Sequence, residues 1–135
     1  MTRGILAVHI VEGKDLKKTD EFGHGDPYVE IWLDKNAQKF KTDVRRDTPT
    51  PVWDRKYHYN VTNQCELHVR VMDEDILTDD TIGTASVDIS DIYTCYYIDK
   101  WIDLPDVDGK HRDGQVHIIL EYFPPHLIAE YFPSK

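Results

Sequence analysis

Apolar and polar residues alternate with a period of two along most of the chain, which is typical of strands with one buried face. No stretch has the 3.6-residue period of a long helix, and we expect at most one helical turn, over Asp91–Tyr97. Short strands separated by turn residues favour an all-β fold, an eight-stranded antiparallel β-sandwich. The expected strands are marked by Leu6–Ile10, Val29–Leu33, Lys39–Arg45, Trp53–Tyr59, Leu67–Val71, Ala85–Ile89, Trp101–Leu104 and Val116–Tyr122.

The length of 135 residues suits one domain with its own hydrophobic core. We expect the sandwich to occupy residues 1–123 and a proline-bracketed tail to occupy residues 124–135. The tail repeats the Glu-Tyr-Phe-Pro of residues 121–124 at residues 130–133, but two copies do not make a repeat architecture. It could pack on the sandwich or begin a linker.

The net charge of −9, from 25 acidic and 16 basic residues, argues against nucleic acid as a partner. It also disfavours direct docking on anionic lipid, unless something reverses the charge locally. The two cysteines, Cys65 and Cys95, are too few for a disulfide framework and favour a reduced, cytoplasmic chain. No signal peptide or apolar stretch of membrane-spanning length is recognisable, and we expect a monomer.

The acidic residues gather between particular strands. Asp20 and Asp26 lie between the first and second expected strands, in a segment with two glycines. A second group lies between the fifth and sixth strands and comprises Asp73, Asp75, Asp79 and Asp80. If both loops meet at one end of the sandwich, six carboxylates converge, and two such charges ~4 Å apart repel by ~4 kcal/mol at an effective dielectric constant near 20. Such a cluster needs a cation or raised pKa values.

Oxygen ligands in flexible loops suit Ca²⁺ better than Mg²⁺ or Zn²⁺. Asp73 and Asp75 are two residues apart, which places both side chains on one face of an extended segment. The alternative for each aspartate taken alone is a turn residue that bonds its own backbone. The spacing of the whole set favours a calcium site.

Three segments resemble the C2 domain family, and the similarity runs from about Gly4 to Phe123. Asp20-Glu-Phe-Gly-His-Gly-Asp-Pro-Tyr-Val29 resembles the first calcium loop and the strand after it. Thr48-Pro-Thr-Pro-Val-Trp53 resembles the turn before the fourth strand, and residues 71–83 resemble the third calcium loop. The resemblance implies a Greek-key sandwich of the type II topology, in which the last strand comes from the C-terminal end.

The resemblance also implies a ligand set for two or three Ca²⁺ ions: carboxylates of Asp20, Asp26, Asp73, Asp75 and Asp80, and main-chain carbonyls of Thr19 and Glu74. The third loop is one residue shorter than in many members, so either Asp79 or Asp80 could be the last ligand, and we favour Asp80. Bound calcium would reverse the local charge and attract an anionic phospholipid surface, so the switch is electrostatic.

Three apolar residues lie among these carboxylates: Phe22 in the first loop and Ile76 and Leu77 in the third. We expect them to insert into a bilayer; the alternative is that Leu77 or Phe22 folds back onto the sandwich. Lys39 and Lys41 alternate on one strand and resemble the family's basic patch for lipid headgroups, although exposed strands often carry lysine only to block edge pairing.

No Ser-His-Asp order, nucleophile motif or phosphate loop is recognisable, so we do not expect an enzyme. The leading hypothesis is a calcium-dependent phospholipid-binding module that is recruited from the cytoplasm to membranes when calcium rises. The alternative is a calcium-independent C2-type domain that binds a protein partner, in which case the outward-facing Trp32 and the tail would matter more than the loops.

Overall fold

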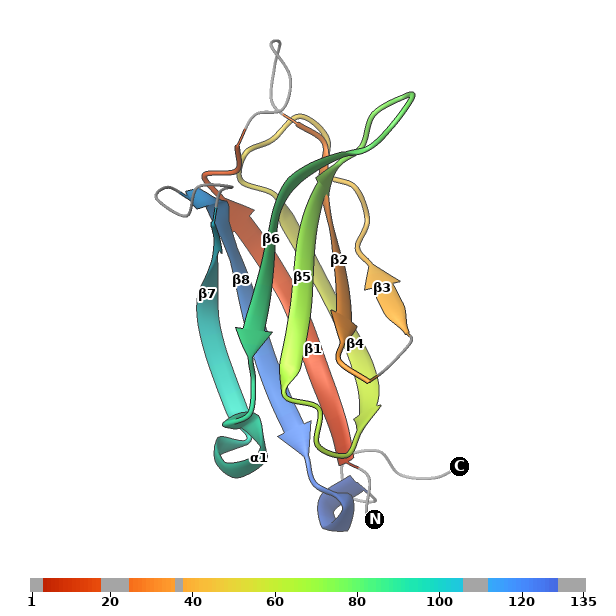
Figure 1. The fold of residues 1–135 in the computed structure, drawn as a ribbon, viewed down its shortest axis with the longest axis vertical. Coiled ribbons are helices and arrows are strands. Elements are labelled where there is room, and N and C mark those ends of the chain that lie inside the picture. The colour runs from red at the N-terminus through yellow and green to blue at the C-terminus, as the bar shows by residue number, and fades with distance from the viewer. Residues whose placement is uncertain (1–3, 18–24, 36–37, 106–111, 129–135) are drawn as a thin grey trace.

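The described residues, 4–17, 25–35, 38–105 and 112–128, form eight strands in two antiparallel sheets that pack face to face in this computed structural model (Figure 1). One sheet has the order β4-β1-β8-β7 and the other β3-β2-β5-β6. The strands are β1 (Gly4–Lys14), β2 (Pro27–Leu33), β3 (Lys39–Lys41), β4 (Val52–Val61), β5 (Glu66–Asp73), β6 (Asp80–Asp88), β7 (Tyr97–Pro105) and β8 (Arg112–Phe123).

The predicted all-β sandwich is confirmed, and β8 lies between β1 and β7 as the type II arrangement requires. The helical turn expected within residues 91–97 is present as α1 (Ile92–Cys95). The tail contributes a 3₁₀ turn, η1 (Pro125–Leu127), directly after β8. Among the described residues, no helix is both long and apolar enough to cross a membrane.

Two expected strand boundaries are wrong. The strand expected over Lys39–Arg45 ends at Lys41, because at Thr42 a side chain replaces the backbone carbonyl in the pairing: its hydroxyl accepts a 2.9 Å hydrogen bond from the Val29 amide. The sixth strand ends at Asp88, and Ile89 follows it as a buried residue outside the strand. Both Thr42 and Ile89 are buried, which explains why these positions looked like parts of strands.

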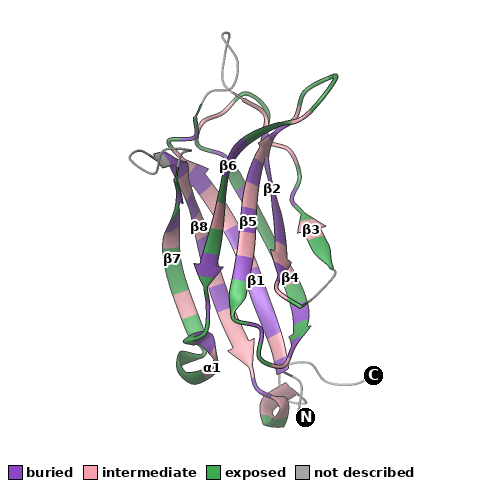
Figure 2. Ribbon diagram, viewed as in Figure 1, coloured by how far each residue is buried: buried purple, intermediate pink, exposed green. Residues whose placement is uncertain are grey.

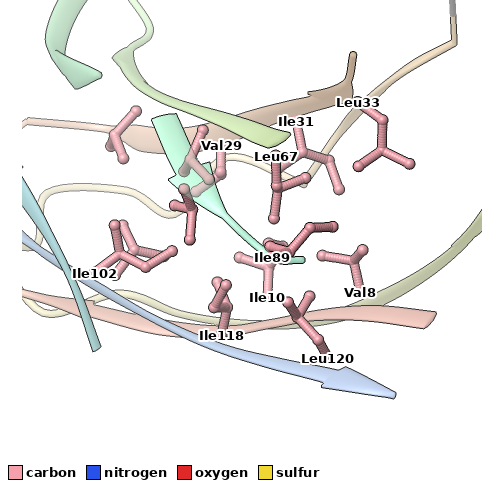
Figure 3. Close-up of a cluster of buried hydrophobic side chains, with 14 of the residues drawn as sticks. Val8, Ile10, Val29, Ile31, Leu33, Leu67, Ile89, Ile102, Ile118 and Leu120 are labelled. Atoms are coloured by element: carbon pink, nitrogen blue, oxygen red, sulfur yellow. The ribbon is translucent and has the colours of Figure 1, made fainter. Parts of the chain in front are cut away.

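The core lies between the two sheets. The alternating apolar residues of β1, β2, β5 and β8 point inward, so buried positions recur along each strand (Figure 2). Figure 3 shows Val8 and Ile10 of β1 and Ile118 and Leu120 of β8 facing the residues of β2 and β5 across this interior. Burying a side chain of this size stabilises the fold by about 1.5–3 kcal/mol. Because this core holds the strands, the loops at their ends can carry charge without defining the fold.

Candidate functional site

Three loops meet through their described residues at one end of the sandwich, which we call the tip: the first loop (residues 15–26), the second (residues 42–51) and the third (residues 74–79) (Figure 1). Backbone hydrogen bonds join them. The Thr48 amide donates to the Gly25 carbonyl at 3.1 Å, and the Glu74 amide donates to the Asp26 carbonyl at 3.0 Å. The end of the first loop therefore lies between the other two.

Asp26 and Asp73 are in direct contact, although they are 47 residues apart. The Asp26 amide donates a 2.8 Å hydrogen bond to Oδ1 of Asp73, a residue that is only 3% exposed. Gly25 permits this approach, because a Cβ at that position would lie 3.0 Å from the Asp73 carboxyl carbon. The structure thus brings the two expected acidic loops together at these residues.

The core also positions Asp26. Pro27, the next residue, accepts a 3.1 Å hydrogen bond from the indole Nε1 of Trp53 and a 3.0 Å hydrogen bond from the Arg45 amide. Trp53 is 1% exposed, so this contact ties the start of β2 to the interior. The Thr48–Trp53 segment therefore supports the first loop as well as turning the chain into β4.

Asp79 and Asp80, the two candidates for the last ligand, have different surroundings. Asp80 pairs with Asp73 in the antiparallel register of β5 and β6, and directly paired residues project to the same face. Asp79 instead accepts a 2.5 Å hydrogen bond from the Tyr28 hydroxyl. That hydrogen bond lowers the pKa of the Asp79 carboxyl, while burial and the same bond raise the pKa of Tyr28.

Ile76 and Leu77 lie in the middle of the third loop and are 98% and 93% exposed. Leu77 therefore does not fold back onto the sandwich. The loop is shaped by two short contacts: the Asp75 amide donates to Asp79 Oδ1 at 3.1 Å, and the Ile76 amide donates to Asp75 Oδ1 at 2.6 Å. Two adjacent apolar side chains with almost full exposure are costly in water and are typical of an interaction site.

Arg46, in the second loop, lies at the tip, where its contacts with the acidic loops were not predicted from the sequence. Its Nη2 lies 2.8 Å from Oε1 of Glu74, and its Nη1 lies 3.5 Å from Oδ2 of Asp26. The hydrogen bond to Glu74, followed by the nearby charges, raises the pKa of the guanidinium. The sequence does show an arginine in the turn segment between the two acidic loops. Its partners could not be predicted, because a long side chain can reach in many directions.

Lys39 and Lys41 of β3 lie on the outer face of their sheet, each beside an aromatic ring. The Lys39 ammonium is 4.7 Å from the Trp32 ring centroid, and the Lys41 ammonium is 5.6 Å from that of Tyr28. Arg70 also faces Trp32, at 5.2 Å. The partly exposed Trp32 thus lies on a face that combines aromatic rings with cations.

Three expected site residues, Thr19, Asp20 and Phe22, lie outside the described residues. Within the part of the chain that the structure describes, no three histidine, cysteine, aspartate or glutamate side chains gather closely enough to hold a metal ion. The expected ligands that the structure describes are all oxygen donors, which is the donor type that calcium prefers. They come from separate loops. One of them, Asp26, already contacts a cation, the guanidinium of Arg46.

A groove of about 460 Å³ lies away from the tip. It runs between the edge strands β6 and β7, where it is lined by Val87, Lys100, Ile102 and neighbouring residues. Asp88 and Asp103 line this groove, but neither belongs to the predicted ligand set, so its size alone does not make it the candidate site.

Comparison with known proteins gives a consistent set of relatives. The C2 domain family model matches residues 4–104. Extended synaptotagmin-1 of mouse is 31% identical over 136 aligned residues, which cover 95% of this chain and 12% of that protein, and the human protein gives the same identity and coverage. The chain therefore spans about an eighth of the length of these relatives.

Solved structures agree with this assignment. A calcium-bound pair of C2 domains from extended synaptotagmin 2 superposes with a TM-score of 0.78 and 28% identity, over 90% of this chain and 46% of that one. A single C2 domain of plant extended synaptotagmin 1 has a TM-score of 0.79 at 23% identity, covers 92% of this chain and 97% of that one, and supports the fold alone. The chain belongs to the C2 domain family and is homologous to the C2 domains of extended synaptotagmins.

Proposed function

We propose that this C2 domain binds anionic phospholipid surfaces in a calcium-dependent manner. The observation that carries the proposal is the contact of Asp26 with the buried Asp73, beside a third loop that exposes Ile76 and Leu77 almost completely. Carboxylates next to apolar side chains form a surface that anionic lipid repels until a cation neutralises the carboxylates. Calcium would provide that neutralisation and would leave the apolar pair free to enter the bilayer.

The ions, two or three in number, would be held by Asp20, Asp26, Asp73, Asp75 and Asp80, with the carbonyls of Thr19 and Glu74. Each ion supplies two positive charges, so the tip would change from acidic to cationic. The solved calcium-bound C2 domains of extended synaptotagmin 2 support this choice of metal, since they are structurally similar over 90% of the chain. Lys39 and Lys41 would add headgroup contacts on the adjacent face of the sheet.

In a cell, the proposed cycle is recruitment from the cytoplasm to a membrane as calcium rises and release as it falls. The domain would act as a targeting module without catalysis of its own. The alternative, a calcium-independent domain that binds a protein partner, would use the partly exposed Trp32 face, where two cations stand over the ring.

Co-sedimentation with phosphatidylserine-containing and pure phosphatidylcholine vesicles, with Ca²⁺ or with a chelator, tests the proposal. We expect binding only with phosphatidylserine and Ca²⁺. The double substitution Asp73→Asn with Asp75→Asn should abolish it and leave the circular-dichroism spectrum unchanged. Binding that persists in the chelator, or no binding in either buffer, would favour the protein-partner alternative.

A further inference from the structure

The tip contains its own cation. Arg46 contacts carboxylates from two different loops, Asp26 of the first and Glu74 of the third, at 3.5 Å and 2.8 Å. The second oxygen of Asp26, Oδ1, accepts a 2.8 Å hydrogen bond from the Asp47 amide. Both oxygens of Asp26 are therefore engaged by the second loop.

These contacts draw the three loops together by charge. Without Arg46, Asp26 and Glu74 would face each other with no guanidinium between them, and like charges at short range repel. The Arg46 side chain is 66% exposed, so water screens its ion pairs and they can break at low cost. A cation held in this way stabilises the tip and can still be displaced.

A calcium ion that uses Asp26 needs the same carboxylate. Arg46 reaches Oδ2 of Asp26, and a divalent ion and a guanidinium that share one oxygen would repel each other. We propose that Arg46 is an internal counter-ion that competes with calcium for Asp26 and so sets the calcium affinity of the tip. This inference rests on the proposed calcium-dependent function and adds a residue that tunes it.

The chain offers a matched control. Arg55 of β4 also pairs with an aspartate, Asp43, and its side chain is 51% exposed. Asp43 belongs to the second loop but is not among the proposed ligands. Arg55→Gln therefore removes the same charge and the same kind of ion pair as Arg46→Gln, without touching Asp26.

The experiment is calorimetric titration of Ca²⁺ into lipid-free wild type, Arg46→Gln and Arg55→Gln. We expect Arg46→Gln to bind calcium about threefold to tenfold more tightly than Arg55→Gln, since only the former frees Asp26. Arg46→Lys keeps the charge but lacks the fork that reaches two carboxylates, so its affinity should fall between those of wild type and Arg46→Gln. Equal affinities for the two glutamine variants, or weaker binding by Arg46→Gln, would overturn the proposal.

A second readout separates this inference from the proposed function. In calcium-free buffer, a double-mutant cycle of Arg46→Gln and Glu74→Gln should show non-additive effects on the melting temperature, because the two side chains are in contact. If wild type and Arg46→Gln both give flat calcium titrations, the calcium function itself fails. If wild type binds calcium and the cycle is additive, only the counter-ion role fails.

Discussion

The hydroxyl of Tyr28 lies 2.5 Å from a carboxylate oxygen of Asp79 and donates a hydrogen bond to it. Tyr28 is itself 5% exposed, so Asp79 is held against the outer face of β2, beside Lys41. Asp80, the next residue, is instead paired with Asp73 across the β5–β6 ladder. Asp79, the last residue of the third loop, and Asp80, the first residue of β6, thus have different partners.

Asp80→Asn should therefore weaken calcium binding about tenfold or more, whereas Asp79→Asn should change it less than about threefold. Asp79→Asn should instead lower the melting temperature in calcium-free buffer, because it weakens the bond to Tyr28. Calcium titration and thermal unfolding of both variants provide the check, with Tyr28→Phe as a control that breaks the same bond from the other side. The reverse ranking of the two calcium affinities would make Asp79 the ligand.

Replacing Ile76 and Leu77 together by alanine should weaken vesicle binding at saturating calcium by about tenfold or more. Each side chain contributes about 1.5–3 kcal/mol when a bilayer covers it fully. The calcium affinity in lipid-free buffer should not change, since neither side chain is a ligand. Tyr97→Ala is a suitable control, because Tyr97 is 53% exposed at the other end of the sandwich. Unchanged vesicle binding in the alanine variant would refute insertion by these residues.

Gly25→Ala should reduce calcium affinity with a smaller effect on the fold. The added Cβ would lie 3.0 Å from both the carboxyl carbon and Oδ2 of Asp73, so the carboxylate has to move. Calcium titration and urea unfolding of the same sample separate the two effects. A loss of unfolding free energy with normal calcium affinity would mean that Asp73 is not part of the calcium site.

Trp53→Phe tests how far the core supports the tip. The substitution removes the indole hydrogen bond to the Pro27 carbonyl and leaves a void in the core, which should cost about 2–4 kcal/mol of unfolding free energy. We also expect weaker calcium binding, because Pro27 follows Asp26 directly. Urea denaturation measures the first effect and calorimetry the second; full calcium affinity would show that the core contact does not set the geometry of the loop.

His117 predicts a pH dependence that involves none of the proposed calcium ligands. Its Nε2 lies 2.6 Å from Asp99 of β7 and its Nδ1 lies 3.3 Å from Glu12 of β1. Its ring stacks on Trp101, and the Lys14 ammonium lies over the ring of Trp101. Burial lowers the pKa of the imidazole, but the hydrogen bonds to Asp99 and Glu12 outweigh it and raise the pKa above its ordinary value.

A raised pKa in the folded state means that the folded protein holds this proton more tightly than the unfolded chain does. The contribution of His117 to stability is therefore complete below the unfolded pKa and is lost as pH rises through the folded pKa. Wild type should lose more unfolding free energy than His117→Gln between about pH 6 and pH 8. Chemical denaturation across this range is the measurement, and parallel pH profiles for the two proteins would contradict the assignment.

The strands were predictable because period-2 alternation reports one-sided burial directly. Leu67, Val69 and Val71 are all buried, as their alternation with polar residues requires. The shift of register in β1 between Ile10 and Glu12 was not predicted, and it is this bulge that places Glu12 opposite His117. A bulge adds one residue and shifts the phase of the alternation after it, but β1 ends at Lys14, so too few positions follow Ile10 for the sequence to reveal the shift.

The residues of the candidate site, like the strands, were predictable, but most of their contacts were not. Spacing and residue type marked Asp26 and Asp73 as members of two acidic segments, and these residues meet because the start of β2 and the end of β5 lie at the same end of an antiparallel pair. The partners of the remaining side chains were not predictable, because they depend on side-chain reach. Arg46 spans two loops, and Tyr28 separates Asp79 from Asp80, through contacts that no spacing rule contains.

The pairing of Ile5 with Phe123 places both chain ends of the sandwich at the pole opposite the three loops (Figure 1). A fluorophore, a surface tether or a further domain joined on either side would thus stand on the water-facing pole of a docked molecule. Such an attachment could move without contacting the bilayer. Tension between such an attachment and a docked tip would act along the strands.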